Sequence, residues 1–226
     1  MDASLTTILQ CLCVALVAML YAAVGHGGAT GYIALLSLFG LQHEEIATTA
    51  LMLNTVVVSI ALTNYYRAGR FQLTQALPYL ILSIPLAYLG ARLPVDKRTF
   101  AYLLGTMLTL AALRFAFLPD TTAKSKNTTA STNSSGPEST VSEELVQPPS
   151  KVLAASAGGI LGLLSGIVGI GGGVFLSPLI IFKHWATTKQ TSAISALFIV
   201  VNSISGLIGR ISDGKGAMIH LLPFLL

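Results

Sequence analysis

The sequence predicts an all-α, polytopic membrane protein with two related helical repeats of inverted orientation, each containing a short, glycine-broken half-helix. The prediction rests on the composition, on a series of membrane-length apolar segments and on a glycine-rich motif that occurs twice. Of the 226 residues, 53% are hydrophobic and 10% are charged, and the mean hydropathy is +0.75. A soluble domain carries about 25% charged residues. We therefore expect a multi-pass protein of the cell membrane (inner or plasma membrane).

Residues 1–118 form the expected first membrane repeat. A helix needs about 20 apolar residues to cross the bilayer, and one of the apolar segments here, 29–41, is too short. The expected helices cover residues 5–24, 29–41, 46–66, 73–93 and 99–118. Residues 119–150 are rich in Ser, Thr, Asn and Pro and nearly free of large apolar side chains, so we expect a disordered polar linker.

Residues 151–226 form the expected second repeat, with apolar segments in the same order. The expected helices cover residues 152–168, 171–182 (again short), 191–209 and 217–226. The last segment is about half a span, since a full span takes about 20 residues. Compared with the first repeat, the second is therefore expected to be truncated.

The two repeats align through their glycines. The stretch "AVGHGGATGYIALLSLFG" (23–40) pairs with "IVGIGGGVFLSPLIIFKH" (167–184), and "AGRFQLTQALPYLIL" (68–82) pairs with "DGKGAMIHLLPFLL" (213–226). If an odd number of segments crosses in the first repeat, the second enters the membrane upside down. Inverted repeats of this kind are the plan of many secondary transporters.

A GxGG ahead of a short helix has a specific chemical consequence. The first N–H groups of a helix lack partners within the helix, and its N-terminus carries about half a positive charge. Glycine lets a ligand approach the bare backbone, so a helix that starts inside the bilayer predicts a small-anion site. The glycines expected to bind substrate are Gly25, Gly27, Gly28, Gly169, Gly171, Gly172 and Gly173. The alternative is that they only allow close helix packing, as Gly158, Gly162 and Gly166 are expected to do.

Polar side chains near the breaks complete the predicted substrate site. His26 titrates near neutral pH and is a candidate for anion binding and for proton coupling, or it fills a packed helix end. Asn54 and Asn202 follow the short helices and offer uncharged donors, either to an anion or across helices. Thr191 and Ser192 are weaker candidates, because such hydroxyls often bond to their own helix.

The motifs resemble the sulfite exporter TauE/SafE family. The resemblance is carried by "VGHGGATGY", by its repeat "VGIGGGVFLSPLII" and by "TSAISALFIVVNS" behind it, and it covers both membrane halves but not the linker. It implies a multi-pass membrane protein of two related halves that moves small anions outward, such as sulfite or organosulfonates. Alternating access would then expose an anion held at the helix starts.

Other functions fit the residues less well. A membrane hydrolase needs a base with an orienting acid, and no expected span contains Asp or Glu. A cation or metal transporter and a non-transporting truncated fragment stay open as alternatives. The composition implies no nucleic acid, cofactor or metal, and the expected partners are a small anionic substrate and the lipid bilayer, with the oligomeric state open.

Overall fold

The structure is a computed structural model of the chain. It describes residues 12–19, 28–40, 43–69, 73–96, 98–103, 105–106, 109, 113 and 148–214. Within these ranges the regular structure is helical throughout and contains no strand, so the predicted all-α class is confirmed. The expected segment at 217–226, and Gly25, His26 and Gly27, lie outside the described residues.

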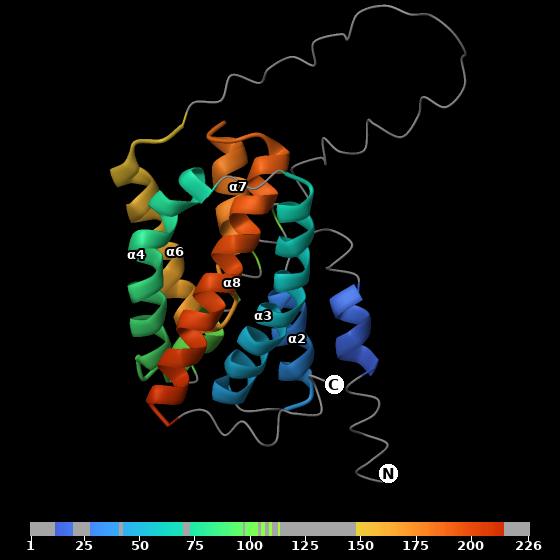
Figure 1. The fold of residues 1–226 in the computed structure, drawn as a ribbon. Helices are drawn as coiled ribbons and strands as arrows, with labels where there is room; N and C mark the ends of the chain where they lie inside the picture. The colour runs from blue at the N-terminus through green and yellow to red at the C-terminus, as the bar shows by residue number, and fades with distance from the viewer. Residues whose placement is uncertain are drawn as a thin grey trace, which may run out of the picture.

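Six helices carry the architecture (Figure 1). They are α2 (Ala29–Leu38), α3 (His43–Arg67), α4 (Leu73–Arg92), α6 (Lys151–Val168), α7 (Gly173–Phe182) and α8 (Thr188–Ser212). Residues 12–19 and 98–103 are also helical. Among the described residues, α3, α4, α6 and α8 are long and apolar enough to cross a membrane, as a multi-pass protein requires.

The two halves contain helices of matching length. Both α2 and α7 have 10 residues, and both α3 and α8 have 25. The start of α8 differs from the expected residue 191, because Thr187 and Gln190 form a capping box that begins the helix at Thr188. The start of α7 moves from 171 to Gly173, because Gly171 and Gly172 take left-handed conformations.

Helices α3 and α8 run in opposite directions. Figure 1 shows α3 rising from its blue end while α8 descends toward its red end. Side-chain contacts agree: Val58 packs with Ile199, and Leu51 lies next to Gly206, further along α8. The two 25-residue helices are therefore antiparallel neighbours.

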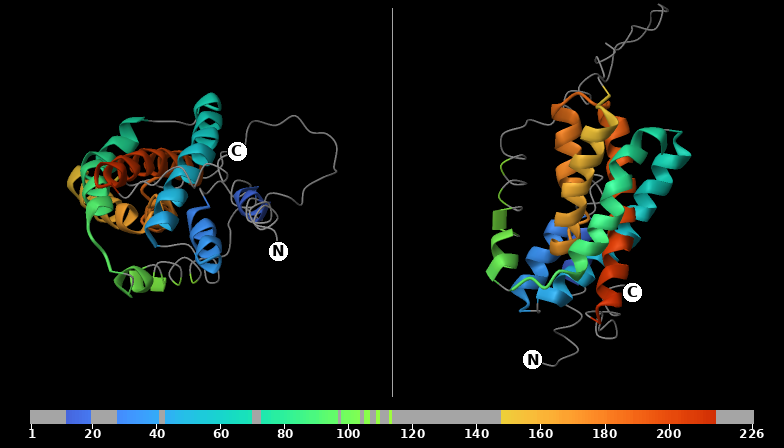
Figure 2. Two further views of the ribbon diagram at one scale, coloured as in Figure 1. Left: turned by 90° about the horizontal axis from the view of Figure 1, so that it is seen from below. Right: turned by 90° about the vertical axis from the view of Figure 1, so that its left-hand side faces the viewer.

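Helices α4, α6 and α8 form a close-packed group, side by side in Figures 1 and 2. Gly158, Gly162 and Gly166 of α6 lie directly against the backbone of α4, and a Cβ atom on Gly162 would come within 2.5 Å of the Ser83 carbonyl oxygen. These contacts confirm that the three glycines pack helices closely. Since the contacts advance along α4 and α6 together, the two helices are parallel.

A broken helix between α6 and α7

The second glycine-rich motif separates α6 from α7. Gly169 ends α6 with φ 84°, and Gly172 precedes α7 with φ 74°. Gly171, between them, has φ 77°. L-residues with side chains rarely adopt this left-handed region, which explains why glycines occupy these three positions. The chain therefore turns sharply and starts a new helix.

This turn lies at the mid-depth of two full spans. A Cβ atom on Gly171 would lie 2.8 Å from Ile199 Cγ2, 3.0 Å from Asn54 Nδ2 and 3.1 Å from Ser203 Oγ. Asn54 is near the middle of α3, and Ile199 is near the middle of α8. A 25-residue helix is about 37 Å long, so Gly171 lies far from either end of both helices.

The start of α7 presents backbone donors at this depth. The first helical hydrogen bonds are donated by Phe175 and Leu176, both to the Gly172 carbonyl oxygen at 3.2 Å. The N–H groups of Gly173 and Val174 precede these bonds, and no side chain caps the helix. Such an end carries a partial positive charge and suits an anion.

Asn54 joins α3 to this turn. Its Nδ2 donates to the Ile170 carbonyl oxygen at 3.0 Å, and the side chain is fully buried. Its Oδ1 is buried and accepts no hydrogen bond. A carbonyl can only accept, so the bond to Ile170 fixes which side of the amide carries the oxygen.

Two serines also lie at the turn, Ser203, which the sequence offers only as a weak candidate, and Ser165, to which no sequence pattern points. Ser203 Oγ faces Gly171 as described above, and Ser165 Cβ lies 3.3 Å from the position of a Cβ on Gly172. Both side chains are buried, and neither hydroxyl has a hydrogen-bond partner. Serines in membrane helices usually bond to their own preceding turn, so an unbonded pair at a helix start is unusual.

Asn202 is on the same side of α8, one turn after Phe198, whose ring contacts Gly172. Its Oδ1 accepts a hydrogen bond from the Ser83 hydroxyl of α4. Its Nδ2 is buried and donates none. One end of the amide therefore links α4 and α8, and the other end is a buried donor without a hydrogen-bond partner.

Thr191 and Ser192 are not brought to the turn. Thr191 Oγ1 bonds to the Thr187 carbonyl at 2.9 Å and Ser192 Oγ to that of Thr188 at 3.1 Å. Thr191 lies eleven residues before Asn202, or about 16 Å along the helix at 1.5 Å per residue. Their hydroxyls stabilise the start of α8.

The first glycine motif is described only from Gly28 onward. Gly28 precedes α2 with φ 73°, without a side-chain cap, and its carbonyl accepts from the Tyr32 N–H at 3.0 Å. The backbone therefore has the same form as at Gly172. Ala29 of α2 and Val174 of α7 belong to one buried apolar cluster, which also contains Ile170.

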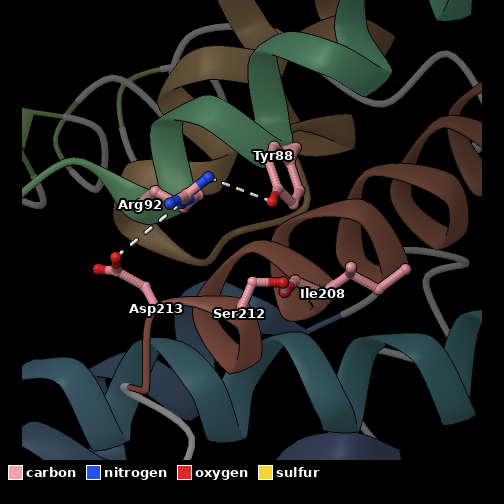
Figure 3. Close-up of polar contacts among 5 residues, drawn as sticks. All are labelled: Tyr88, Arg92, Ile208, Ser212 and Asp213. Carbon is pink, nitrogen blue, oxygen red and sulfur yellow. Dashed lines mark hydrogen bonds and ion pairs between the residues drawn. The ribbon is translucent and has the colours of Figure 1, made fainter.

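Polar groups also gather where α4, α6 and α8 end. Arg92 of α4 donates to Tyr88 Oη at 3.3 Å and lies 3.9 Å from Asp213, just after α8 (Figure 3). Arg210 is buried and donates to the carbonyls of Gly166 and Ile167 at 3.2 and 2.9 Å. These contacts satisfy the last carbonyls of α6 and join the three helices.

Asp96 caps the next helical segment, outside the membrane-length helices. Its carboxylate accepts from the N–H groups of Arg98 and Thr99 at 3.2 and 3.4 Å. A side-chain hydrogen bond with Thr99 is the main cause that holds the pKa of this carboxyl below its usual value. The ionised form therefore suits the helix start.

A bundle of membrane-length helices, in which one short helix starts beside polar groups at mid-depth, is typical of secondary membrane transporters. The family model of the sulfite exporter TauE/SafE matches residues 10–226. The chain therefore belongs to this family, and the resemblance of the glycine motifs is confirmed.

The chain is also similar to the probable membrane transporter protein y4hK of Sinorhizobium fredii (strain NBRC 101917 / NGR234). The two are 33% identical over 210 residues, which are 93% of this chain and 78% of the relative. No solved structure matches the chain.

Proposed function

We propose that the protein exports small anions, such as sulfite or organosulfonates, by alternating access, and that it is not an enzyme. The anion binds at helix N-termini near the bilayer midplane. The start of α7 supports this proposal, because the buried, unpartnered serines Ser165 and Ser203 lie at mid-depth beside backbone N–H groups that precede the first hydrogen bonds of the helix. Neutral donors in a dry environment bind an anion strongly without a formal positive charge.

An inverted repeat is part of the proposal. Superimposing α3 on α8 by their bounds pairs Asn54 with Ile199 and Val58 with Ser203. Val58 packs with Ile199, while Asn54 and Ser203 both face Gly171. If the two helices are exchanged, the pair Val58 and Ile199 takes the place of the pair Ser203 and Asn54. This correspondence supports a two-fold relation between the halves.

The remaining substrate contacts are also proposed. They comprise Gly25, His26, Gly27, Gly28, Asn54, Gly169, Gly171, Gly172, Gly173 and Asn202; Thr191 and Ser192 are not proposed as contacts, because their hydroxyls bond to their own helix away from the turn. His26 is proposed to couple transport to protons. A His26→Gln variant is then expected to bind the anion but to lose acceleration by a pH gradient.

A cation or metal transporter is the alternative function. A cation prefers carboxylate, carbonyl or imidazole ligands, whereas the start of α7 presents N–H and hydroxyl donors. This difference favours the anion.

Transport by the full chain in liposomes tests the proposal. We expect uptake of sulfite or of a sulfonate, and about a tenfold or greater loss of affinity in Ser203→Ala, which removes a buried donor. Ser212→Ala is the matched control on α8, since its hydroxyl bonds to its own helix at Ile208, 2.8 Å away (Figure 3). Uptake of a divalent cation without uptake of either anion would contradict the proposal.

A further inference from the structure

Asn54 Oδ1 is a buried acceptor without a hydrogen-bond partner, on a side chain that lies beside Gly171. The side chain has no exposed surface, and its orientation follows from the bond that Nδ2 donates to Ile170. A ligand that leaves such a buried acceptor unpartnered binds about tenfold to a hundredfold more weakly than one that satisfies it. A bare anion offers only acceptors, so it cannot satisfy this atom.

We propose that the transported anion is a monoprotonated oxyanion, whose single O–H donates to Asn54 Oδ1. Its charged oxygens accept from the backbone N–H groups at the start of α7 and from the Ser203 hydroxyl. This inference rests on the proposed function and narrows its substrate class. It selects hydrogensulfite and similar hydroxyl-bearing monoanions over sulfonates, which carry no O–H.

The geometry supports a ligand that bridges α3 and α8 at the turn. Asn54 Nδ2 and Ser203 Oγ lie 3.0 and 3.1 Å from the position that a Cβ on Gly171 would take. The Asn54 amide, whose Oδ1 has no hydrogen-bond partner, and the Ser203 hydroxyl therefore lie beside the same bare backbone. A small molecule with an O–H donor at one end and acceptor oxygens at the other would match the Asn54 carbonyl and the Ser203 hydroxyl.

The charged residues of α3 and α8 lie toward the helix ends. They are Glu44, Glu45 and Arg67 in α3 and Lys189 and Arg210 in α8. None of those on α3 lies within two turns of Asn54 along the helix. We therefore assign the discrimination between ligands to the ligand's own O–H.

Two probes of equal charge and similar shape test the inference. Hydrogensulfite and methanesulfinate differ in that a methyl group replaces the hydroxyl. We measure their competition for the full chain in nanodiscs, at a mildly acidic pH where hydrogensulfite predominates. We expect hydrogensulfite to bind roughly tenfold to a hundredfold more tightly, the ratio that one unsatisfied buried acceptor implies.

Variants assign the preference to Asn54. In Asn54→Leu the ratio of the two dissociation constants is expected to fall to about one, as the acceptor is lost. Thr55→Val is the matched control on α3, because Thr55 bonds to its own helix at Leu51, and it should keep the ratio. Ser203→Ala should weaken both probes and also keep the ratio.

The outcomes separate the inference from the function on which it rests. Equal binding of the two probes by the unmodified protein would contradict the requirement for a protonated ligand, but it would not contradict anion transport. If Asn54→Leu leaves the ratio of the two dissociation constants unchanged, Asn54 does not accept the hydrogen bond from the ligand. Failure of every anion to bind or cross would overturn the proposed function, and this inference with it.

Discussion

At the scale of single residues, Gly171 combines a left-handed backbone with close neighbours, as Gly169 and Gly172 also do. Its φ of 77° excludes most side chains, and it has Ile199, Asn54 and Ser203 around its α-carbon. Gly69 has a φ of 66° but open space around it. Substitutions at the two glycines therefore distinguish the effect of backbone strain from the effect of a methyl group at the turn.

We expect Gly171→Ala to abolish most anion transport, because a methyl group would occupy the space between Asn54 and Ser203. Gly69→Ala should cost similar backbone strain, about 1–2 kcal/mol, and leave transport largely unchanged. Liposome uptake, normalised to the amount of protein in the membrane, measures both. Equal transport by the two variants would limit Gly171 to a role in folding.

Arg210 and Arg92 give a second comparison of residues. Arg210 is buried and donates two hydrogen bonds to the end of α6, whereas Arg92 is half-exposed and its ion pair with Asp213 spans 3.9 Å (Figure 3). Hydrogen bonds from a charged group contribute about 1.5–3 kcal/mol each, while exposed ion pairs contribute about 0–1 kcal/mol.

We therefore expect Arg210→Leu to lower the thermal unfolding temperature in detergent clearly more than Arg92→Leu does. The difference should not shrink when salt is added, because buried groups are screened little. A larger decrease of the unfolding temperature in Arg92→Leu would show that the exposed ion pair with Asp213 contributes more to stability than the hydrogen bonds from Arg210 to the end of α6.

At the scale of elements, the sequence predicts helices better than it predicts which side chains face one another. The glycine motifs locate α2 and α7, because a left-handed residue must precede each. The expected start of α8, residue 191, is three residues late, because the capping box at Thr187 and Gln190 begins the helix at Thr188. The unbonded hydroxyls of Ser165 and Ser203 cannot be predicted from the sequence, since only packing decides whether they bond to their own helix.

Symmetry does not single out Ser203. Its position in the second half corresponds to Val58 in the first, so a search for polar residues common to both repeats misses it. Asn54 was found because an amide in the middle of a span is rare and costly without a partner.

The contact between α4 and α6 gives a prediction for an element pair. Gly162→Ala would place a methyl group 2.5 Å from the Ser83 carbonyl oxygen, so the helices must move apart, at a cost of about 1–3 kcal/mol. Gly105 has open space around it, and Gly105→Ala is expected to be neutral or slightly stabilising. Thermal unfolding in detergent measures both, and equal stability of the two variants would contradict the close packing.

At the scale of the whole molecule, the close-packed group crosses the boundary between the repeats. Helix α4 belongs to the first half of the sequence, but it packs most extensively against α6 and α8 of the second half. Backbone-to-backbone contacts through glycines resist sliding, because they leave no side chains to rearrange. If the protein works by alternating access, the moving bodies are then not the two sequence halves.

We expect movement between α3 and α8, where side chains rather than backbones meet, and a rigid contact between α4 and α6. Leu51 and Gly206 face each other across the first pair, and Leu82 and Gly159 across the second. In a background with Cys11→Ser and Cys13→Ser, cysteines at Leu51 and Gly206 should stop transport when joined by a short cross-linker. Cysteines at Leu82 and Gly159 should cross-link without stopping it. If the linker is cleavable, its reduction should restore transport in the variant with cysteines at Leu51 and Gly206. If only the variant with cysteines at Leu82 and Gly159 is inhibited by cross-linking, the moving boundary lies between α4 and α6 instead.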